Sequence, residues 1–231
     1  MELLGKLSLW IHILAGLLTL LAGPVAIFYN FKNVKRHKQA GKLFFYAMVV
    51  VCFTSWVGYF KRPDVVFFQF LLGIATIVLA SVIQGIRAIQ LMKGKSVIRF
   101  DFVYNVCLGL FGAWMLQKAY VHFSAGTFIA FPILFFVFGI SAVKNSIAQI
   151  RMLLHADQLA PMVWYKLHVA TMLGAFTAST TAFTVNAAHF LPWYIQWFGP
   201  TLALLPLQFY FAKKISGPGR KAKPAEELQT T

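Results

Sequence analysis

Acidic residues are scarce in this chain, since Asp and Glu together number 6 among 231 residues. All of them lie at the ends of apolar segments, in loops or in the tail: Glu2, Asp64, Asp101, Asp157, Glu226 and Glu227. A pump or transporter that relays protons or coordinates sodium normally places a carboxylate inside the membrane. The sequence therefore disfavours ion coupling through carboxylates.

Cysteine is rare as well, and familiar catalytic motifs are missing. Cys52 and Cys107 both lie inside apolar segments, without the spacing of a disulfide framework or a metal motif. The sequence also lacks a paired-carboxylate site, a nucleophile elbow, a phosphate-binding loop and a metalloprotease helix motif. We therefore name no catalytic residue and favour a protein that is not an enzyme.

Hydrophobic residues, in contrast, make up 59% of the chain, whereas charged residues make up 12%. Seven apolar segments each approach or exceed the roughly 20 residues that cross a bilayer as a helix. They are residues 8–29, 42–60, 66–92, 101–122, 127–154, 163–189 and 193–212. We predict an all-α integral membrane protein with one seven-helix bundle over residues 1–212. A basic, disordered tail over residues 213–231 is expected to follow it.

Basic residues predict how this bundle is oriented. The loops or flanks after the first, third and fifth segments and the tail are rich in Lys and Arg. The other side carries only Lys6, Lys61, Arg62 and Lys118. The positive-inside rule then places the N-terminus outside and the C-terminus in the cytoplasm, which an odd number of spans satisfies.

The same distribution explains the net charge of +15. Basic loops beside a membrane attract anionic lipid headgroups, and the chain has no compact motif that reads a nucleic-acid groove. We therefore predict a multi-pass protein of the cytoplasmic (inner) membrane, with lipid as its main partner and no nucleic acid. Membrane-protein partners and a homo-oligomer stay open.

Histidine is the remaining residue type with reactive chemistry. The predicted topology places His12, His122 and His189 near the outer face, and His37, His155 and His168 near the inner face. His168 and His189 share one face of a helix but would lie about 31 Å apart at 1.5 Å per residue, so they cannot bind one centre. Each tier could instead hold a b-type haem or a transition metal with neutral imidazoles.

The expected ligands differ between the two tiers. An inner centre would use His168, with Met172 one turn along the helix and His37 approaching from the adjoining loop. An outer centre would use His12 with His122 or His189. Histidines near helix ends also occur as plain hydrogen-bonding or hydrated residues, which is the alternative interpretation.

Two further functions stay open beside a haem or metal centre for membrane redox or metal handling. A small-molecule transporter or channel needs a continuous polar path. The few side chains available to line it are Gln69, Gln84, Arg87, Asn105, Gln117, Lys118, Asn145 and Asn186. A non-catalytic accessory subunit would need neither a cofactor nor a path, and would copurify with a membrane complex.

Several short strings resemble those of a family of bacterial predicted polytopic membrane proteins that carry a domain of unknown function. They are HILAG at 12–16, GP at 23–24, KRHKQAGK at 35–42, LHVATMLGA at 167–175, TAFTVN at 181–186 and WFGPT at 197–201. The match covers the first two and last two spans, and Lys38 stands where the family pattern has an arginine. The resemblance implies a bacterial polytopic membrane protein and singles out His12, His37, His168 and Asn186, without implying an activity.

The charge asymmetry makes the topology testable. A reporter fused after Thr231 should be cytoplasmic, and Ser124→Cys in a variant without the native cysteines should react with an impermeant thiol reagent on intact cells. Labelling of the C-terminus from outside the cell would contradict seven spans with this orientation.

Overall fold

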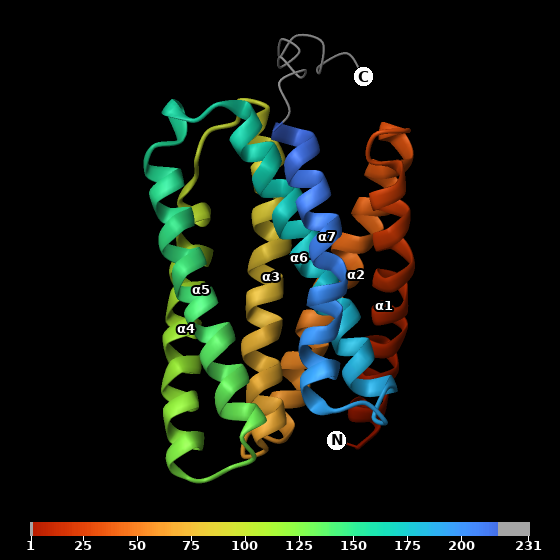
Figure 1. The fold of residues 1–231 in the computed structure, drawn as a ribbon, viewed down its shortest axis with the longest axis vertical. Helices are drawn as coiled ribbons and strands as arrows, with labels where there is room; N and C mark the ends of the chain where they lie inside the picture. The colour runs from red at the N-terminus through yellow and green to blue at the C-terminus, as the bar shows by residue number, and fades with distance from the viewer. Residues whose placement is uncertain (1, 217–231) are drawn as a thin grey trace.

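The computed structural model describes residues 2–216, with side chains from Gly5 to Ile215, and this part of the chain forms seven α-helices and no strand. The helices run up and down (Figure 1). They are α1 (Glu2–Tyr29), α2 (Val34–Lys61), α3 (Val66–Met92), α4 (Arg99–Ser124), α5 (Ala130–Leu154), α6 (Pro161–Ala187) and α7 (Trp193–Ser216). The all-helical prediction is confirmed, while residues 217–231 of the expected tail lie outside the described residues.

The two ends of the bundle differ in the loops they carry. The upper end in Figure 1 holds the α1–α2, α3–α4 and α5–α6 connections and the end of α7. The lower end holds the start of α1 and the other three connections. These names are used below for the two ends.

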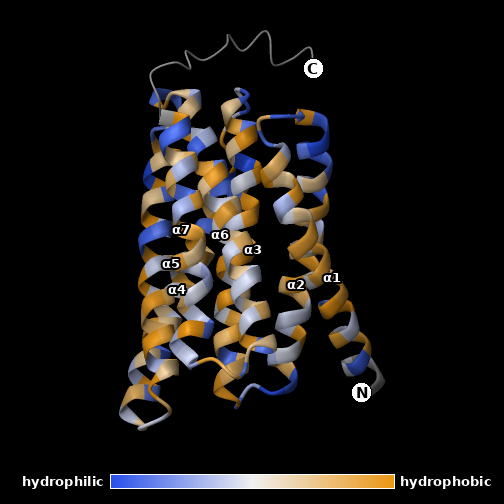
Figure 2. Ribbon diagram, turned by 45° about the vertical axis from the view of Figure 1, so that its right-hand side comes forward, coloured by the Kyte–Doolittle hydropathy of each residue, from blue (hydrophilic) through white to orange (hydrophobic). Residues whose placement is uncertain are grey.

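Four helices are long and apolar enough to cross a membrane: α1 from Gly5, α2, α3 and α5. Their apolar character continues on the outside of the bundle, where Trp10, Leu21 and Phe60 are each more than half exposed. Figure 2 shows hydrophobic residues along the length of the helices and hydrophilic ones mainly toward the ends. This composition is that of a protein whose surface meets lipid.

Helix boundaries agree with the sequence in some places and differ in others. α3 spans the predicted residues 66–92, whereas α2 begins at Val34 instead of residue 42. The side chain of Asn33 accepts a hydrogen bond of 3.0 Å from the backbone N–H of Arg36, which caps the earlier start. α6 ends at Ala187, before His189, and α7 continues to Ser216.

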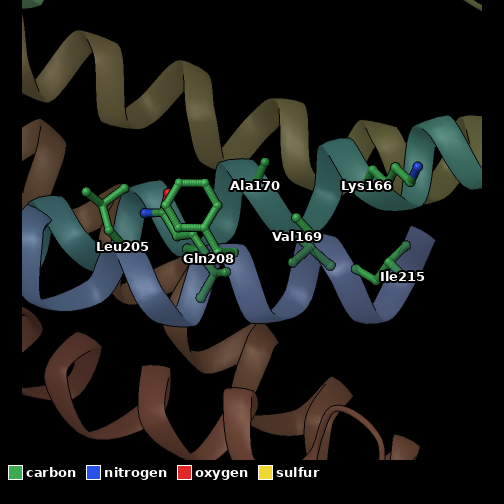
Figure 3. A pocket seen from close by; sticks show the side chains of 9 residues that line it. Lys166, Val169, Ala170, Leu205, Gln208 and Ile215 are labelled. Atoms are coloured by element: carbon green, nitrogen blue, oxygen red, sulfur yellow. The ribbon is translucent and has the colours of Figure 1, made fainter. Parts of the chain in front are cut away.

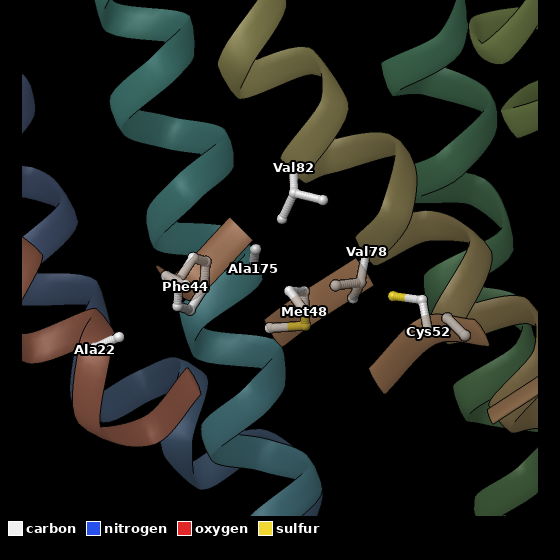
Figure 4. Packing of buried hydrophobic residues seen from close by; sticks show 8 residues of the cluster. Ala22, Phe44, Met48, Cys52, Val78, Val82 and Ala175 are labelled. Atoms are coloured by element: carbon white, nitrogen blue, oxygen red, sulfur yellow. The ribbon is translucent and has the colours of Figure 1, made fainter. Parts of the chain in front are cut away.

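α3 is the central helix of the bundle. It packs against α2, α4, α5 and α6, while α1 pairs with α2, α4 with α5, and α6 with α7. Between α2, α3 and α6 lies a core of buried apolar side chains that includes Met48, Cys52, Val78 and Val82 (Figure 4). α3 thus joins the α4–α5 pair to the other helices.

Two glycines let α4 and α5 approach closely. A Cβ on Gly112 would lie 2.9 Å from the carbonyl oxygen of Gly139, and a Cβ on Gly139 would lie 3.0 Å from that of Gly112. Small residues of this kind allow helix backbones to contact one another in a membrane. The α4–α5 pair therefore depends on having no side chain at this crossing.

We expect Gly112→Ala to destabilise the protein, because the new Cβ would meet backbone atoms that cannot move aside. The loss of unfolding free energy should be about 1–3 kcal/mol, measured by thermal unfolding in detergent. Gly16→Ala is the matched control, since a Cβ there meets nothing within 4 Å. Equal stability of the two variants would contradict the close α4–α5 contact.

Candidate functional site

One pair of histidines comes together near the upper end. His37 lies in the first turn of α2 and His168 lies in α6, and their ring centroids are 6.3 Å apart with an interplanar angle of 78°. His37 belongs to a helix and not to a loop, because α2 begins early. The expected proximity of these two inner histidines is present in the structure.

Hydrogen bonds fix the tautomer of both rings. The Nδ1 atom of His37 lies 2.9 Å from the carbonyl oxygen of Ala26 in α1, and Nδ1 of His168 lies 2.8 Å from that of Gly85 in α3. A carbonyl oxygen only accepts, so Nδ1 carries the hydrogen in each ring. The neutral rings therefore keep the lone pair of Nε2, which is the atom that a metal would take.

Neighbouring side chains enclose His168. The ring of Tyr165 stacks against it with centroids 6.5 Å apart, and the Tyr165 hydroxyl lies 3.4 Å from the side-chain oxygen of Asn30. Met172 packs over Gly85, where a Cβ would lie 2.6 Å from the methionine Cε. Gly85 thus accepts the bond from His168 and leaves room for a thioether one turn farther along α6.

A pair of phenylalanines lies between α2 and α6. Both α2 and α6 begin at the upper end, and two turns below the histidines Phe44 and Phe176 meet with centroids 6.5 Å apart. Phe44 and Ala175 belong to the core shown in Figure 4. Large side chains therefore lie between α2 and α6, and the histidine pair lies two turns above them, toward the upper end.

The lower-end histidines do not come together. Nδ1 of His12 lies 2.8 Å from the Thr54 hydroxyl oxygen, while Nε2 of His122 lies 3.2 Å from the Gln69 side-chain oxygen. His122 is buried and stacks on Phe135, and His189 is exposed in the turn after α6. The outer grouping expected from the sequence is therefore absent from the described contacts.

The remaining upper-end histidine has a local role. His155 follows α5, is exposed, and its Nδ1 lies 2.9 Å from the carbonyl oxygen of Arg151. Among the described residues, His, Cys, Asp and Glu form no group of three or more that could hold a metal. A centre at His37 and His168 would therefore complete its coordination with other atoms, such as the Met172 sulfur or a bound macrocycle.

A second polar region joins α3 to the start of α4. Asp101 is fully buried, and its two carboxylate oxygens lie 2.5 Å from Nε and 2.6 Å from Nη2 of Arg87. The same carboxylate accepts the backbone N–H of Ile98 at 2.9 Å, and Arg87 also donates to Gln90 and to the carbonyl oxygen of Ser96. This bidentate pair was not foreseen, because the sequence places Asp101 only at a helix end.

Amides extend this region into α5. The Gln84 amide donates to the Asn105 side-chain oxygen at 2.8 Å, and the Asn145 amide donates to Gln84 at 3.3 Å. The Ser146 hydroxyl donates to the carbonyl oxygen of Asn105 at 2.7 Å. The Asn105 amide also donates to the backbone carbonyl oxygen of Asp101 at 2.7 Å. Four predicted lining residues, Gln84, Arg87, Asn105 and Asn145, therefore belong to one polar network.

The polar network does not continue through the bundle. Fully buried apolar side chains, among them Leu108, Met115 and Leu134, lie between it and the Gln69–His122 bond at the lower end. Asn186 lies elsewhere, near the lower end of α6, where its amide donates to the carbonyl oxygen of Ala182. The described residues of α3, α4 and α5 thus form no continuous polar path.

No protein-family model, curated protein or solved structure matches this chain. The resemblance to a family of bacterial membrane proteins therefore stays a prediction.

We expect Asp101→Asn to be strongly destabilising, because it leaves the Arg87 guanidinium without its buried counter-charge. Breaking a buried pair in this way costs about 3–5 kcal/mol, to be measured as lost unfolding free energy in detergent. Arg99→Gln, two residues earlier on an exposed position, should change stability by less than about 0.5 kcal/mol.

A double variant separates charge from packing. Arg87→Met with Asp101→Leu removes both charges, so it should be less destabilised than Asp101→Asn alone. A double variant as unstable as the single one would show that the unpaired charge of Arg87 is not the cause of the lost stability.

Proposed function

We propose that this chain is a seven-span protein of the cytoplasmic membrane whose upper end faces the cytoplasm. The four membrane-length apolar helices support the membrane placement, and the up-and-down order of the helices is compatible with seven crossings. The exposed basic residues Lys35, Arg36 and Lys38 at the upper end support the orientation. The family resemblance supports a bacterial polytopic protein.

We further propose that His37 and His168 bind one transition-metal centre, as a free ion or as haem iron, for membrane redox or metal handling. The observation that carries this proposal is the ring separation of 6.3 Å. In a metal site each ligating nitrogen lies about 2.0–2.1 Å from the metal, and the ring centroid lies about 1.2 Å farther away. The centroids of two opposed rings are then about 6.4 Å apart. The observed separation is compatible with two imidazoles that share one centre, provided that their Nε2 atoms face each other.

The side chains available as ligands limit which metals could bind. Both rings are held by backbone carbonyl oxygens that fix the tautomer and leave Nε2 free, as in known metal sites. The buried carboxylate of Asp101 is already paired with Arg87. Imidazole with a nearby thioether selects copper, zinc or iron over magnesium and calcium, which prefer oxygen ligands.

The transporter alternative has less support. Its polar candidates Gln84, Arg87 and Asn105 bond to one another or to Asp101, and an apolar layer lies below them. A satisfied, enclosed network of this kind orders helices and offers no free path to a solute. An accessory role without a cofactor is the outcome that a metal-free protein would support.

The test uses full-length protein purified in mild detergent from cells supplied with a haem precursor and trace metals. We expect one bound centre per chain by optical spectroscopy and elemental analysis, lost in His37→Ala and in His168→Ala. A Soret band would identify haem iron, and metal without that band would identify a free ion.

His155→Ala is the matched control, because this exposed histidine also lies at the upper end but bonds only to its own helix. His12→Ala at the lower end should likewise retain the centre. Colourless, metal-free wild-type protein would overturn the proposal, as would a centre that survives both His37→Ala and His168→Ala.

A further inference from the structure

A groove follows the seam between α6 and α7. One cavity of about 290 Å³ lies toward the upper end, between Lys166, Ala170 and Leu173 of α6 and Leu205 and Ala212 of α7 (Figure 3). A second cavity of about 230 Å³ lies toward the lower end, where side chains of α3 and α5 also line it, and it reaches Trp197 of α7. Gln208 lines both cavities, so they adjoin each other along the seam.

Helical spacing explains why the groove is continuous. On α7 the lining residues recur every three or four positions, at 197, 201, 205, 208, 212 and 215. Residues spaced in this way lie on one face of a helix. On α6 the positions 166, 170, 173, 177 and 181 form the opposing stripe. The two antiparallel stripes bound the upper part of a largely apolar groove, and side chains of α3 and α5, among them Leu71 and Phe138, also line its lower part.

The ends of the groove differ in charge. Lys166 lies in the second turn of α6 at the upper end and is exposed, whereas the wall below it is formed by Val169, Ala170 and Leu173. The figure shows Lys166 at one end of the row of apolar side chains (Figure 3). An ammonium group at one mouth and an apolar wall behind it match an amphiphile with an anionic head and a hydrocarbon tail.

We propose that this groove binds one acyl chain of an anionic phospholipid, whose phosphate pairs with Lys166. The inference rests on the proposed membrane placement and is independent of the histidine centre. The acyl chain covers apolar side chains of α6 and α7, and the phosphate compensates a lysine at headgroup depth. The lipid then contributes to holding α7, which packs mainly on α6.

The experiment compares lipid retention by full-length protein in native mass spectrometry. Phosphatidylglycerol and phosphatidylcholine with identical acyl chains serve as probes. We expect tighter binding of phosphatidylglycerol, and a weakening of about fivefold for that lipid in Lys166→Gln. Lys95→Gln is the control, because Lys95 is exposed at the same end but does not line the groove.

A second variant tests the tail of the lipid without changing charge. Ala170→Phe fills the groove and should lower retention of phosphatidylglycerol, whereas Ala148→Phe on exposed α5 surface should not. Equal binding of the two lipids, or equal losses in Lys166→Gln and Lys95→Gln, would overturn the proposal. His168→Ala should retain the lipid, which separates this test from that of the metal centre.

Discussion

The ion pair between Arg87 and Asp101 fixes the turn of α3 on which both polar regions of the molecule depend. Asp101 is fully buried, so its charge is tolerable only because Arg87 and a backbone N–H meet both oxygens. In the same turn, Gln84 bonds to α4 and Gly85 offers its carbonyl oxygen to His168 in α6. Residues 84–87 therefore hold the α4–α5 pair on one side and the histidine site on the other.

The histidine site is assembled from four helices, α1, α2, α3 and α6, which also share the apolar core below it. α2 and α6 supply the rings, while α1 and α3 supply the carbonyl oxygens of Ala26 and Gly85 that orient them. Phe44 and Phe176 lie between α2 and α6 two turns below. Orientation by backbone oxygens is more rigid than orientation by flexible side chains, which suits a site whose ligands must keep one geometry.

Hydropathy predicts the helices of this chain well, because burial and lipid exposure both require apolar residues over a fixed length. It places α3 at its observed bounds but misses the start of α2, whose first turns are basic and exposed. The signal for that start is local: Asn33 is a helix-capping residue type three positions before Arg36. His189 was placed inside a helix because apolar residues continue past Ala187, although the chain turns there.

Pairwise contacts between helices are harder to predict than the helices. The His37–His168 pair followed from depth alone, since both residues lie near the same end of the bundle. The Arg87–Asp101 pair did not, because a carboxylate in a first helical turn is equally typical of an exposed N-terminus. The spacing of 14 residues between Arg87 and Asp101 does not indicate that the intervening loop folds back and buries the carboxylate.

The scarcity of acidic residues limits the charge that the protein can place beside a metal. The buried carboxylate of Asp101 is paired with Arg87 and joins α3 to α4. None of the described contacts brings a carboxylate to His37 or His168. A bare divalent cation there would gain only dipoles from its ligands, beside the exposed lysines of α2. Among the metals proposed above, Cu(I) and the iron of a porphyrin would leave less uncompensated charge at His37 and His168 than Zn²⁺ would.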